Sequence, residues 1–468
     1  MTIKYLLPTA NRPGQRDRFS VRARKPSMTL VAIALAGLVW LSPDCARALE
    51  ITAAKSEIDS QLDRDYPALE AIYKDIHQHP ELAFHETRTA EKLASEMRAL
   101  GFEVTEHVGK TGLVAIRRNG PGPTIMVRTE LDALPMEEKT GLAYASRERV
   151  SWNGGETFVG HTCGHDAHMA IWVGTAKMLL ALSNQWHGTL MFIGQPAEEV
   201  ASGARAMLND RLFERFGKPD VALALHIGPA PAGLVGYKAG TVTSNMDSLE
   251  ISFKGVGGHG SAPNMTIDPI VEASKFVVDV QTVVSREKDP AAFGVVSVGH
   301  IHGGSAGNII PDETKLQGTI RSYDAAVREK LIAGVQRTAK AIGEMANAPA
   351  PEVVIDRESV KAVTNDQALA GRIGPVFSAA FGGDAILVGS PTTASEDFSE
   401  FGNVGIPSFF FGLGALDPKR VKEARDGGKP LPGNHSPFFA PEPEPTIRRG
   451  VQAMTLAALT VLNAVAAK

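Results

Sequence analysis

The sequence predicts an α/β fold: a mainly parallel sheet whose chain is interrupted by an inserted α+β domain. Between residues 111 and 241, segments of helical character alternate with short strands. These strands are nearly continuous apolar runs, such as "TIMVRTE" and "VALALHIGP", as expected for parallel strands covered by helices on both faces. From about residue 242 the strands instead alternate apolar and polar residues, which is typical of a sheet with one exposed face.

The first part of this sheet domain is expected in residues 49–241. Two helices come first, the second starting near Glu86 and ending at a glycine. Strands follow in "TGLVAIRR" and "TIMVRTELDALP", and then a helix in "AHMAIWVGTAKMLLAL". The segment closes with a strand in "GTLMFIGQPAEE", a helix around "SGARAMLND" and a strand in "VALALHIGP".

The inserted domain is expected in residues 242–357. Its helices fall at 269–287 and about 324–346, between strands in "SLEISFKG", "AFGVVSVGHIHGG", "KLQGTIRSY" and "PEVVIDRES". This β-α-β-β-α-β order matches a ferredoxin-like split unit. The main sheet then resumes in residues 358–468, with a strand near "IPSFFFGLG" and a tail helix. Arg, Gln and Thr interrupt the apolar surface of that helix, so it is expected in the protein core rather than in a membrane.

Residues 1–48 are typical of an export signal peptide. Basic residues precede the apolar run "TLVAIALAGLVWL", and Ala46 and Ala48 fit a small-x-small cleavage site. A thirteen-residue run is too short to span a bilayer, which needs about 20 residues. The sequence therefore predicts a periplasmic or secreted protein with no stable membrane insertion after cleavage. A lipid anchor at Cys45 and a retained anchor are alternatives, and Met28 is an alternative start because the basic stretch is long.

Cleavage would change both the charge and the cysteine content. Residues 1–48 hold eight Lys or Arg and two Asp, so their removal takes the formal net charge from −4 to −10. An acidic chain of this kind argues against nucleic-acid binding, which needs a basic surface. Cys163 would remain as the only cysteine. An intrachain disulfide is then excluded, and a free thiol in an oxidising compartment needs another explanation.

Residue types that bind metals occur at four places, three of them directly after a predicted strand. They are Cys163 and His165 in "GHTCGHDAH", Glu198 and Glu199 in "QPAEE", His226 after "VALAL", and His435 in "GNHSPFF". Sites in open α/β sheets form outside the carboxyl ends of strands, so these side chains are expected to converge. Taken singly, each also fits a structural role: a loop histidine, a solvated glutamate at a helix start, or a small buried thiol.

A thiolate, imidazoles and a carboxylate together suit Zn, Mn, Co or Ni better than Ca or Mg. Adjacent glutamates can divide the work, because one can bind metal while the other takes a proton from metal-bound water. A thiolate bound to metal is a poor nucleophile, which argues against a Cys/His protease.

Nine motifs carry a resemblance to a known family along nearly the whole mature chain. They are "PELAFHETRTAEKL", "RTELDALP", "GHTCGHDAH", "QPAEE", "GVGGHGSAP", "GGSAGNIIPDE", "GTIRSYD", "SEDFSEF" and "NHSPFF", in order from residue 80 to 439. The chain resembles the dinuclear metal family of aminoacylases and zinc carboxypeptidases. Within that family it is most similar to the amidohydrolase subgroup of hippurate hydrolases and auxin-conjugate hydrolases.

The resemblance implies a zinc-peptidase-like catalytic domain in residues 49–241 and 358–468, with residues 242–357 as a lid and dimerisation domain. It implies two divalent metal ions per chain, such as Zn, Mn, Ni or Co, and a homodimer or higher homo-oligomer. The implied metal ligands are Cys163, His165, Glu199, His226 and His435. Glu198 would be the general base.

Further substrate contacts are implied outside the ligand set. His259 and Asn308 would bind the substrate or its oxyanion, often across the dimer, and Arg321 would bind the carboxylate of an amino acid. A turn histidine, a turn asparagine and a surface strand arginine are the corresponding structural alternatives. Asp132 and Asp166 are expected to orient ligands, with a helix N-cap as the alternative for Asp166. Glu130 stands where relatives have an Asp or a metal histidine, so its role is left open.

The expected function is hydrolysis of the amide bond of N-acyl amino acids or similar small conjugates through a metal-bound hydroxide. A metallo-carboxypeptidase or dipeptidase on the same scaffold is the alternative, because the scissile bond is an amide in both. A non-catalytic periplasmic binding protein is disfavoured, because a pure binder has no need of the Glu198–Glu199 pair.

Overall fold

The computed structural model describes residues 43–356 and 360–463. Most of the predicted export segment, including the alternative start Met28, and the predicted boundary at residue 357 lie outside the described residues. The side chain of Cys45 lies outside them as well.

The larger sheet has eight strands and a mainly parallel centre, as the sequence predicts. In spatial order they are β1 (Glu103–Val108), β2 (Gly112–Asn119), β6 (Gly188–Gln195), β3 (Thr124–Glu130), β7 (Val221–Pro231), β18 (Ser408–Leu416), β8 (Val235–Tyr237) and β17 (Ala385–Leu387). Strands β6, β3, β7 and β18 run parallel to one another. Strands β1 and β2 are antiparallel additions at one edge, and β8 is antiparallel to β18. The four central strands therefore end together at one edge of the sheet.

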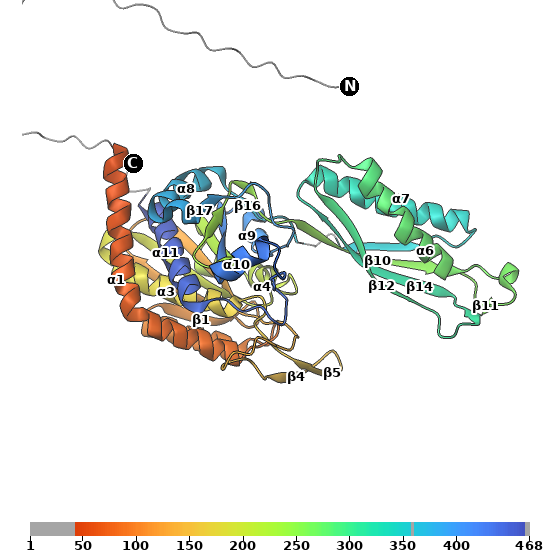
Figure 1. The fold of residues 1–468 in the computed structure, drawn as a ribbon, viewed down its shortest axis with the longest axis horizontal. Coiled ribbons are helices and arrows are strands. Elements are labelled where there is room, and N and C mark those ends of the chain that lie inside the picture. Colours follow the sequence, from red (N-terminus) through yellow and green to blue (C-terminus); the bar gives the residue numbers. More distant parts are fainter. Residues whose placement is uncertain (1–42, 357–359, 464–468) are drawn as a thin grey trace, which may run out of the picture.

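Helices cover both faces of this sheet (Figure 1). One face packs against α1 (Pro43–Gln78), α2 (Thr87–Ala99), α3 (His165–Ala181), α8 (Gln367–Phe381) and α11 (Pro443–Leu462). The other face packs against the shorter helices α4 (Gly203–Asn209), α5 (Leu212–Phe216) and α9 (Ser399–Asn403). The tail helix α11 contacts α1, α3 and α8, so it lies in the core as expected. None of the helices in the described part of the chain is long and apolar enough to cross a membrane.

A second, four-stranded antiparallel sheet has its own apolar core. Its strands lie in the order β12 (Gly294–Gly303), β14 (Glu313–Ser322), β10 (Asn245–Lys254) and β15 (Glu352–Asp356). Helices α6 (Pro269–Asp279) and α7 (Ala325–Met345) pack on it through a separate cluster of buried apolar residues. The elements follow one another as β10, α6, β12, β14, α7, β15, and they form the smaller lobe in Figure 1.

Short pairs of strands complete the fold. They are the hairpin β4 (Arg149–Trp152) with β5 (Gly155–Phe158), β9 (Gly240–Thr241) with β16 (Thr364–Asn365), and β11 (Gly258–His259) with β13 (Ile309–Ile310). Helix α10 (Pro418–Arg425) follows β18. In Figure 1, β11 lies at the end of the smaller lobe that points away from the larger lobe.

Candidate metal centre

The five predicted metal ligands converge at the carboxyl edge of the larger sheet. Cys163 Sγ lies 3.4 Å from His226 Nε2, and Glu199 Oε2 lies 3.2 Å from His435 Nε2. The other oxygen of Glu199, Oε1, lies 3.9 Å from His165 Nε2. Ligand atoms of Cys163, Glu199 and His435 all lie within 4.8 Å of one another. Residues separated by up to 272 positions in the sequence thus form one cluster.

His226 reaches the cluster from a position that differs from the expected one. The sequence placed it in the turn after a strand, but β7 continues to Pro231, so His226 lies within the strand. Its side chain still lies beside Cys163, because the turn before α3 packs against this part of β7. Gly164 in that turn has a φ of +95°, and an added Cβ would lie 2.3 Å from Ile227 Cδ1. Glycine therefore permits the close approach of the Cys163–His165 turn to β7.

Backbone carbonyls fix the orientation of two of the imidazoles. His165 Nδ1 donates to the carbonyl of Asp132 at 2.8 Å, and His226 Nδ1 donates to the carbonyl of Ile227 at 2.7 Å. Each ring then presents Nε2, with its lone pair, to the cluster. Asp132 also accepts a hydrogen bond from the Glu199 N–H at 2.9 Å, as expected for a residue that orients ligands.

Two unpaired polar atoms of the cluster indicate that it can bind a cation. His165 Nε2 and Glu199 Oε1 are buried and have no hydrogen-bond partner among the described residues. Buried polar atoms are seldom left unpaired, and an imidazole lone pair facing a carboxylate oxygen is repulsive. A divalent ion between them would bind both atoms. The donor set of one sulfur, three imidazoles and a carboxylate fits Zn, Mn, Co or Ni.

The electrostatics favour the thiolate of Cys163. Burial alone would raise the pKa of this thiol, but the nearby imidazoles of His226 and His165 lower it to about 6. Burial lowers the pKa of His226, yet the Cys163 thiolate raises it to about 9. A metal would compete with the proton on His226, so metal binding by these residues should release protons.

Glu198 lies beside the ligands and contacts a second group of acidic residues. Its Oε2 is 3.8 Å from His165 Nε2. Carboxylate oxygens of Glu198, Glu396 and Asp397 lie within 4.8 Å of one another. Burial, together with the charges of Glu396 and Glu199, raises the pKa of Glu198 well above its usual value. A carboxylate of this kind accepts a proton readily.

Arg128 balances much of this negative charge. Its guanidinium donates to Glu396 at 2.7 Å, to Asp397 at 3.1 Å and to the side chain of Gln195 at 2.9 Å. It also forms a buried ion pair with Glu130. Nothing in the sequence singles out Arg128, because a lone arginine in a strand gives no sign of its partners.

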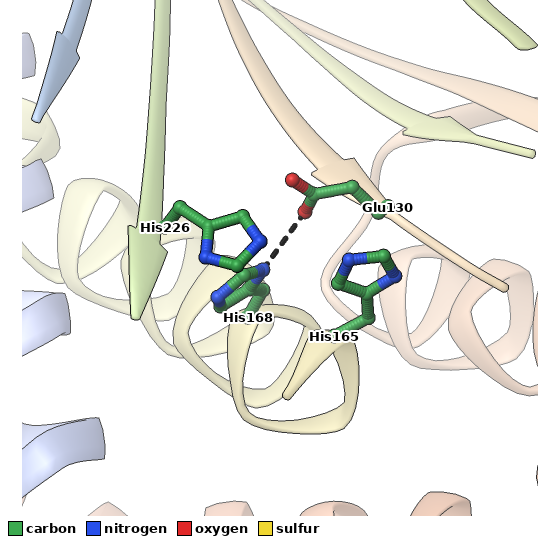
Figure 2. Close-up of side chains that lie close together, drawn as sticks. All are labelled: Glu130, His165, His168 and His226. Carbon is green, nitrogen blue, oxygen red and sulfur yellow. Dashed lines mark hydrogen bonds and ion pairs between the residues drawn. The ribbon is translucent and has the colours of Figure 1, made fainter. Parts of the chain in front are cut away.

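A neighbouring group of titratable residues, Glu130, His165, His168 and His226, also has the spacing of a metal site (Figure 2). His168, however, uses both ring nitrogens. Nδ1 lies 3.0 Å from Glu130 Oε2, and Nε2 accepts the N–H of Ile227 at 2.9 Å. Glu130 is itself paired with Arg128. These two residues therefore support the position of β7 beside His226 and leave His165 and His226 free to bind metal.

Asp166 does not orient a ligand histidine as expected. Its Oδ2 lies 2.6 Å from Nδ1 of His77 in α1, whose other ring nitrogen is 3.1 Å from Glu138. Burial lowers the pKa of His77, but hydrogen bonds to the two carboxylates raise it to about 10. This buried ion-pair network fixes the start of α3 to α1. The role of His77 could not be predicted from the sequence, because its partners lie far away in the chain.

The loop that carries His435 is attached to the same turn. The Asn434 side chain donates to the carbonyls of Cys163, at 2.8 Å, and Ile227, at 3.1 Å. His435 has a φ of +66°, and Ala197 and Ala201, on either side of the glutamate pair, have φ of +49° and +53°. Such left-handed conformations are uncommon for residues with a Cβ and cluster at functional sites.

The predicted substrate contacts fall in different places. Arg321 lines a cavity of about 1030 Å³ that also contains Cys163, Glu198, His226 and His435. His259 and Asn308 are exposed, at the β11–β13 pair of the smaller lobe, and they are not among the residues that line the cavity. Within one chain, the structure does not bring them to the metal ligands.

Comparisons with known proteins identify similar chains. Residues 126–427 match the model of peptidase family M20/M25/M40. The chain is 37% identical to the hippurate hydrolase of Campylobacter jejuni over 71% of this chain and 84% of that protein. It is 32% identical to thermostable carboxypeptidase 1 of Saccharolobus solfataricus, over 84% and 95% of the two chains. It also resembles the crystal structure of a dinuclear metal-binding M20 peptidase from Bacillus subtilis, with a TM-score of 0.69 and 28% identity, over 86% and 99% of the two chains.

Replacing His168 distinguishes the predicted ligand cluster from the neighbouring group in Figure 2 as the metal site. We expect His168→Gln to retain the metal content of the parent protein, because neither ring nitrogen is available to a metal. We also expect a lower melting temperature, since the Ile227 N–H and Glu130 lose a buried partner at a cost of about 1–3 kcal/mol. Elemental analysis and thermal unfolding measure the two effects. His226→Gln is the control that should lose metal, and equal metal loss in both variants would contradict the assignment.

Proposed function

The chain belongs to peptidase family M20/M25/M40, and we propose that it is a metal-dependent amidohydrolase that cleaves N-acyl amino acids or similar small conjugates. One observation carries the proposal: four metal-ligand side chains lie around a half-buried glutamate pair, of which Glu199 completes the ligand cluster and Glu198 adjoins it. The similarity to a hippurate hydrolase supports the substrate class, since hippurate is itself an N-acyl amino acid.

We propose that Cys163, His165, Glu199, His226 and His435 hold two divalent ions. The two oxygens of Glu199 face different histidines, His165 and His435, so this carboxylate would help to hold the ions together with both imidazoles. Bound metal ions would supply Lewis acidity, which polarises a carbonyl and acidifies water. The mixed sulfur and nitrogen ligands are compatible with zinc, manganese, nickel or cobalt.

Glu198 is the group that moves the proton. It lies beside the ligand cluster without completing it, and its acidic neighbours favour its protonated form. Glu198 would take a proton from the attacking water and transfer it to the leaving nitrogen. The carbonyl carbon and the leaving nitrogen must therefore lie between Glu198 and the ligand cluster.

Arg321 is suited to bind the carboxylate of the leaving amino acid. It is partly buried, and it has no acidic partner among the described residues. Its guanidinium donates to Ser395 Oγ at 3.0 Å, so it reaches from β14 of the smaller lobe to the loop before α9, which lines the same cavity. Two of its N–H groups could form a bidentate pair with a carboxylate.

We propose that His259 and Asn308 act in the cavity of a second copy of the chain. Both are exposed at the far end of the smaller lobe, where a partner chain could receive them. A homodimer with a mobile lid would complete each site in this way. The signal-like residues 1–48 support a periplasmic or secreted location.

Carboxypeptidase activity is the second candidate, because the chain is similar to a thermostable carboxypeptidase over most of its length. Hydrolysis of hippurate-like amides and of dipeptides by the same metal-loaded preparation separates the two. Faster cleavage of dipeptides would favour the carboxypeptidase.

Replacing Glu198 tests its role as the base. We expect Glu198→Gln to retain both metal ions and to lower kcat by at least about 10²–10⁴-fold, the usual contribution of a positioned acid–base group. Glu137→Gln, at an exposed glutamate paired with Lys139, is the matched control and should behave like the parent protein. A Glu198→Gln variant with near-parental kcat would exclude this residue as the base.

Mixing two inactive variants tests the proposed dimer. His259→Ala and Glu198→Gln should each be inactive alone. After subunit exchange, a mixed dimer contains one site with an intact Glu198 and an intact His259, so an equimolar mixture should recover about a quarter of the parental activity. No recovery after exchange that mass spectrometry confirms would show that His259 does not act across the dimer.

A further inference from the structure

A row of residues crosses the larger sheet from the metal cluster to the sheet edge. His226 of β7 pairs with Gly412 of β18, Gly412 pairs with Gly236 of β8, and Gly236 pairs with Ile386 of β17. Residues directly opposite one another on neighbouring strands point to the same face of a sheet. The four residues therefore share the face on which His226 presents its imidazole to the cluster.

The two glycines leave this row without side chains between its ends. A Cβ added to Gly412 would have no heavy atom nearer than 3.7 Å, and a Cβ on Gly236 would meet Val388 Cγ2 at 3.0 Å. All four residues of the row, and Val388, line the cavity that contains the metal ligands. We call these five residues the acyl trough. With strands about 4.8 Å apart, its floor extends about 14 Å from His226 to Ile386.

The far end of the acyl trough is apolar and exposed. Ile386 is 41% exposed and Val388 is 36% exposed, although both line the cavity. Lys238, a charged residue near this end, directs its ammonium to the carbonyls of Ala239 and Thr241. Exposed apolar side chains that are continuous with a reaction centre indicate a surface covered by an apolar part of the substrate.

The two halves of the substrate have separate places in the cavity. Glu198 transfers its proton to the leaving nitrogen, and it adjoins Glu396 in the loop whose Ser395 binds Arg321. The amino acid therefore lies toward this loop. The acyl trough starts at His226, on the side of the ligand cluster that contacts Cys163. Because the amino acid lies toward the other loop, the acyl group would occupy the acyl trough.

We propose that the acyl trough binds an unbranched aliphatic acyl chain of about eight to twelve carbons, an inference that rests on the proposed function. An extended chain advances about 1.2 Å per bond, so acyl chains of eight and twelve carbons extend about 8 Å and about 13 Å along the floor, toward Ile386 and Val388. An acetyl group would leave nearly all of the acyl trough empty. A benzoyl group would fill its beginning and leave its apolar end exposed.

A series of N-acylglycines tests this inference with the metal-loaded full chain. The acyl groups are acetyl, butanoyl, hexanoyl, octanoyl, decanoyl and benzoyl. We expect kcat/KM to rise by about four-fold per added methylene, the usual effect of burying one such group, and to level off at about ten carbons. Decanoylglycine should also be cleaved faster than benzoylglycine.

Filling the acyl trough should shorten the preferred chain. Gly412→Leu, next to the metal ligand, should abolish the rise with chain length, whereas Gly236→Leu should end it near hexanoyl. Gly371→Leu is the control for the glycine-to-leucine change itself, because Gly371 is an exposed residue of α8 where an added Cβ meets no atom within 4 Å. The readout is the ratio of decanoyl to acetyl kcat/KM within each variant, so partial loss of folded or metal-loaded protein cancels.

The possible results are distinguishable. If no amide is cleaved, the proposed function fails. If amides are cleaved but kcat/KM is flat or falls with chain length, or benzoylglycine is preferred, the inference about the acyl trough fails while the function stands. An unchanged ratio in Gly412→Leu would also overturn it.

Discussion

The carboxyl edge of the larger sheet depends on one buried cation, the guanidinium of Arg128. It binds Glu130 from its own strand, Gln195 at the end of β6, and Glu396 and Asp397 from the loop before α9. Removing one partner of a buried ion pair typically costs about 3–5 kcal/mol, because the remaining charge is left uncompensated. These contacts fix the strand end that leads to the glutamate pair. Through Glu130 and His168, they also fix the backbone of β7 next to His226.

The polar side chains around the cluster fall into two groups, those whose polar atoms are all paired and those with an unpaired atom. Side chains whose atoms are all paired, such as His168 and Asp166, hold the scaffold together. Those with an unpaired atom toward the cluster, such as His165 and Glu199, are free to bind metal. Glu198 belongs to neither group. It faces a negatively charged neighbourhood that favours proton uptake, which supports the proposed role of this residue as the base.

Much of this arrangement could be predicted from the sequence, and physical reasons explain which parts could not. Apolar runs identified the central parallel strands because both faces of those strands are covered. Strands β1, β8 and β17 of the larger sheet were missed: β1 is largely exposed or half-buried, and β8 and β17 have only three residues each. The ligand residues could be named from short motifs. The roles of Arg128, His77 and His168 could not, since each depends on partners distant in the sequence. His226 was expected in a turn, and only the register of β7 shows it within a strand.

The proposed metal centre depends on the thiol of Cys163 as a metal ligand. X-ray absorption spectroscopy of the metal-loaded protein tests it directly, because sulfur and nitrogen neighbours of a metal scatter differently. We expect a sulfur neighbour at about 2.3 Å from zinc in the parent protein and none in Cys163→Ser. A parent protein whose metal has only nitrogen and oxygen neighbours would contradict the assignment.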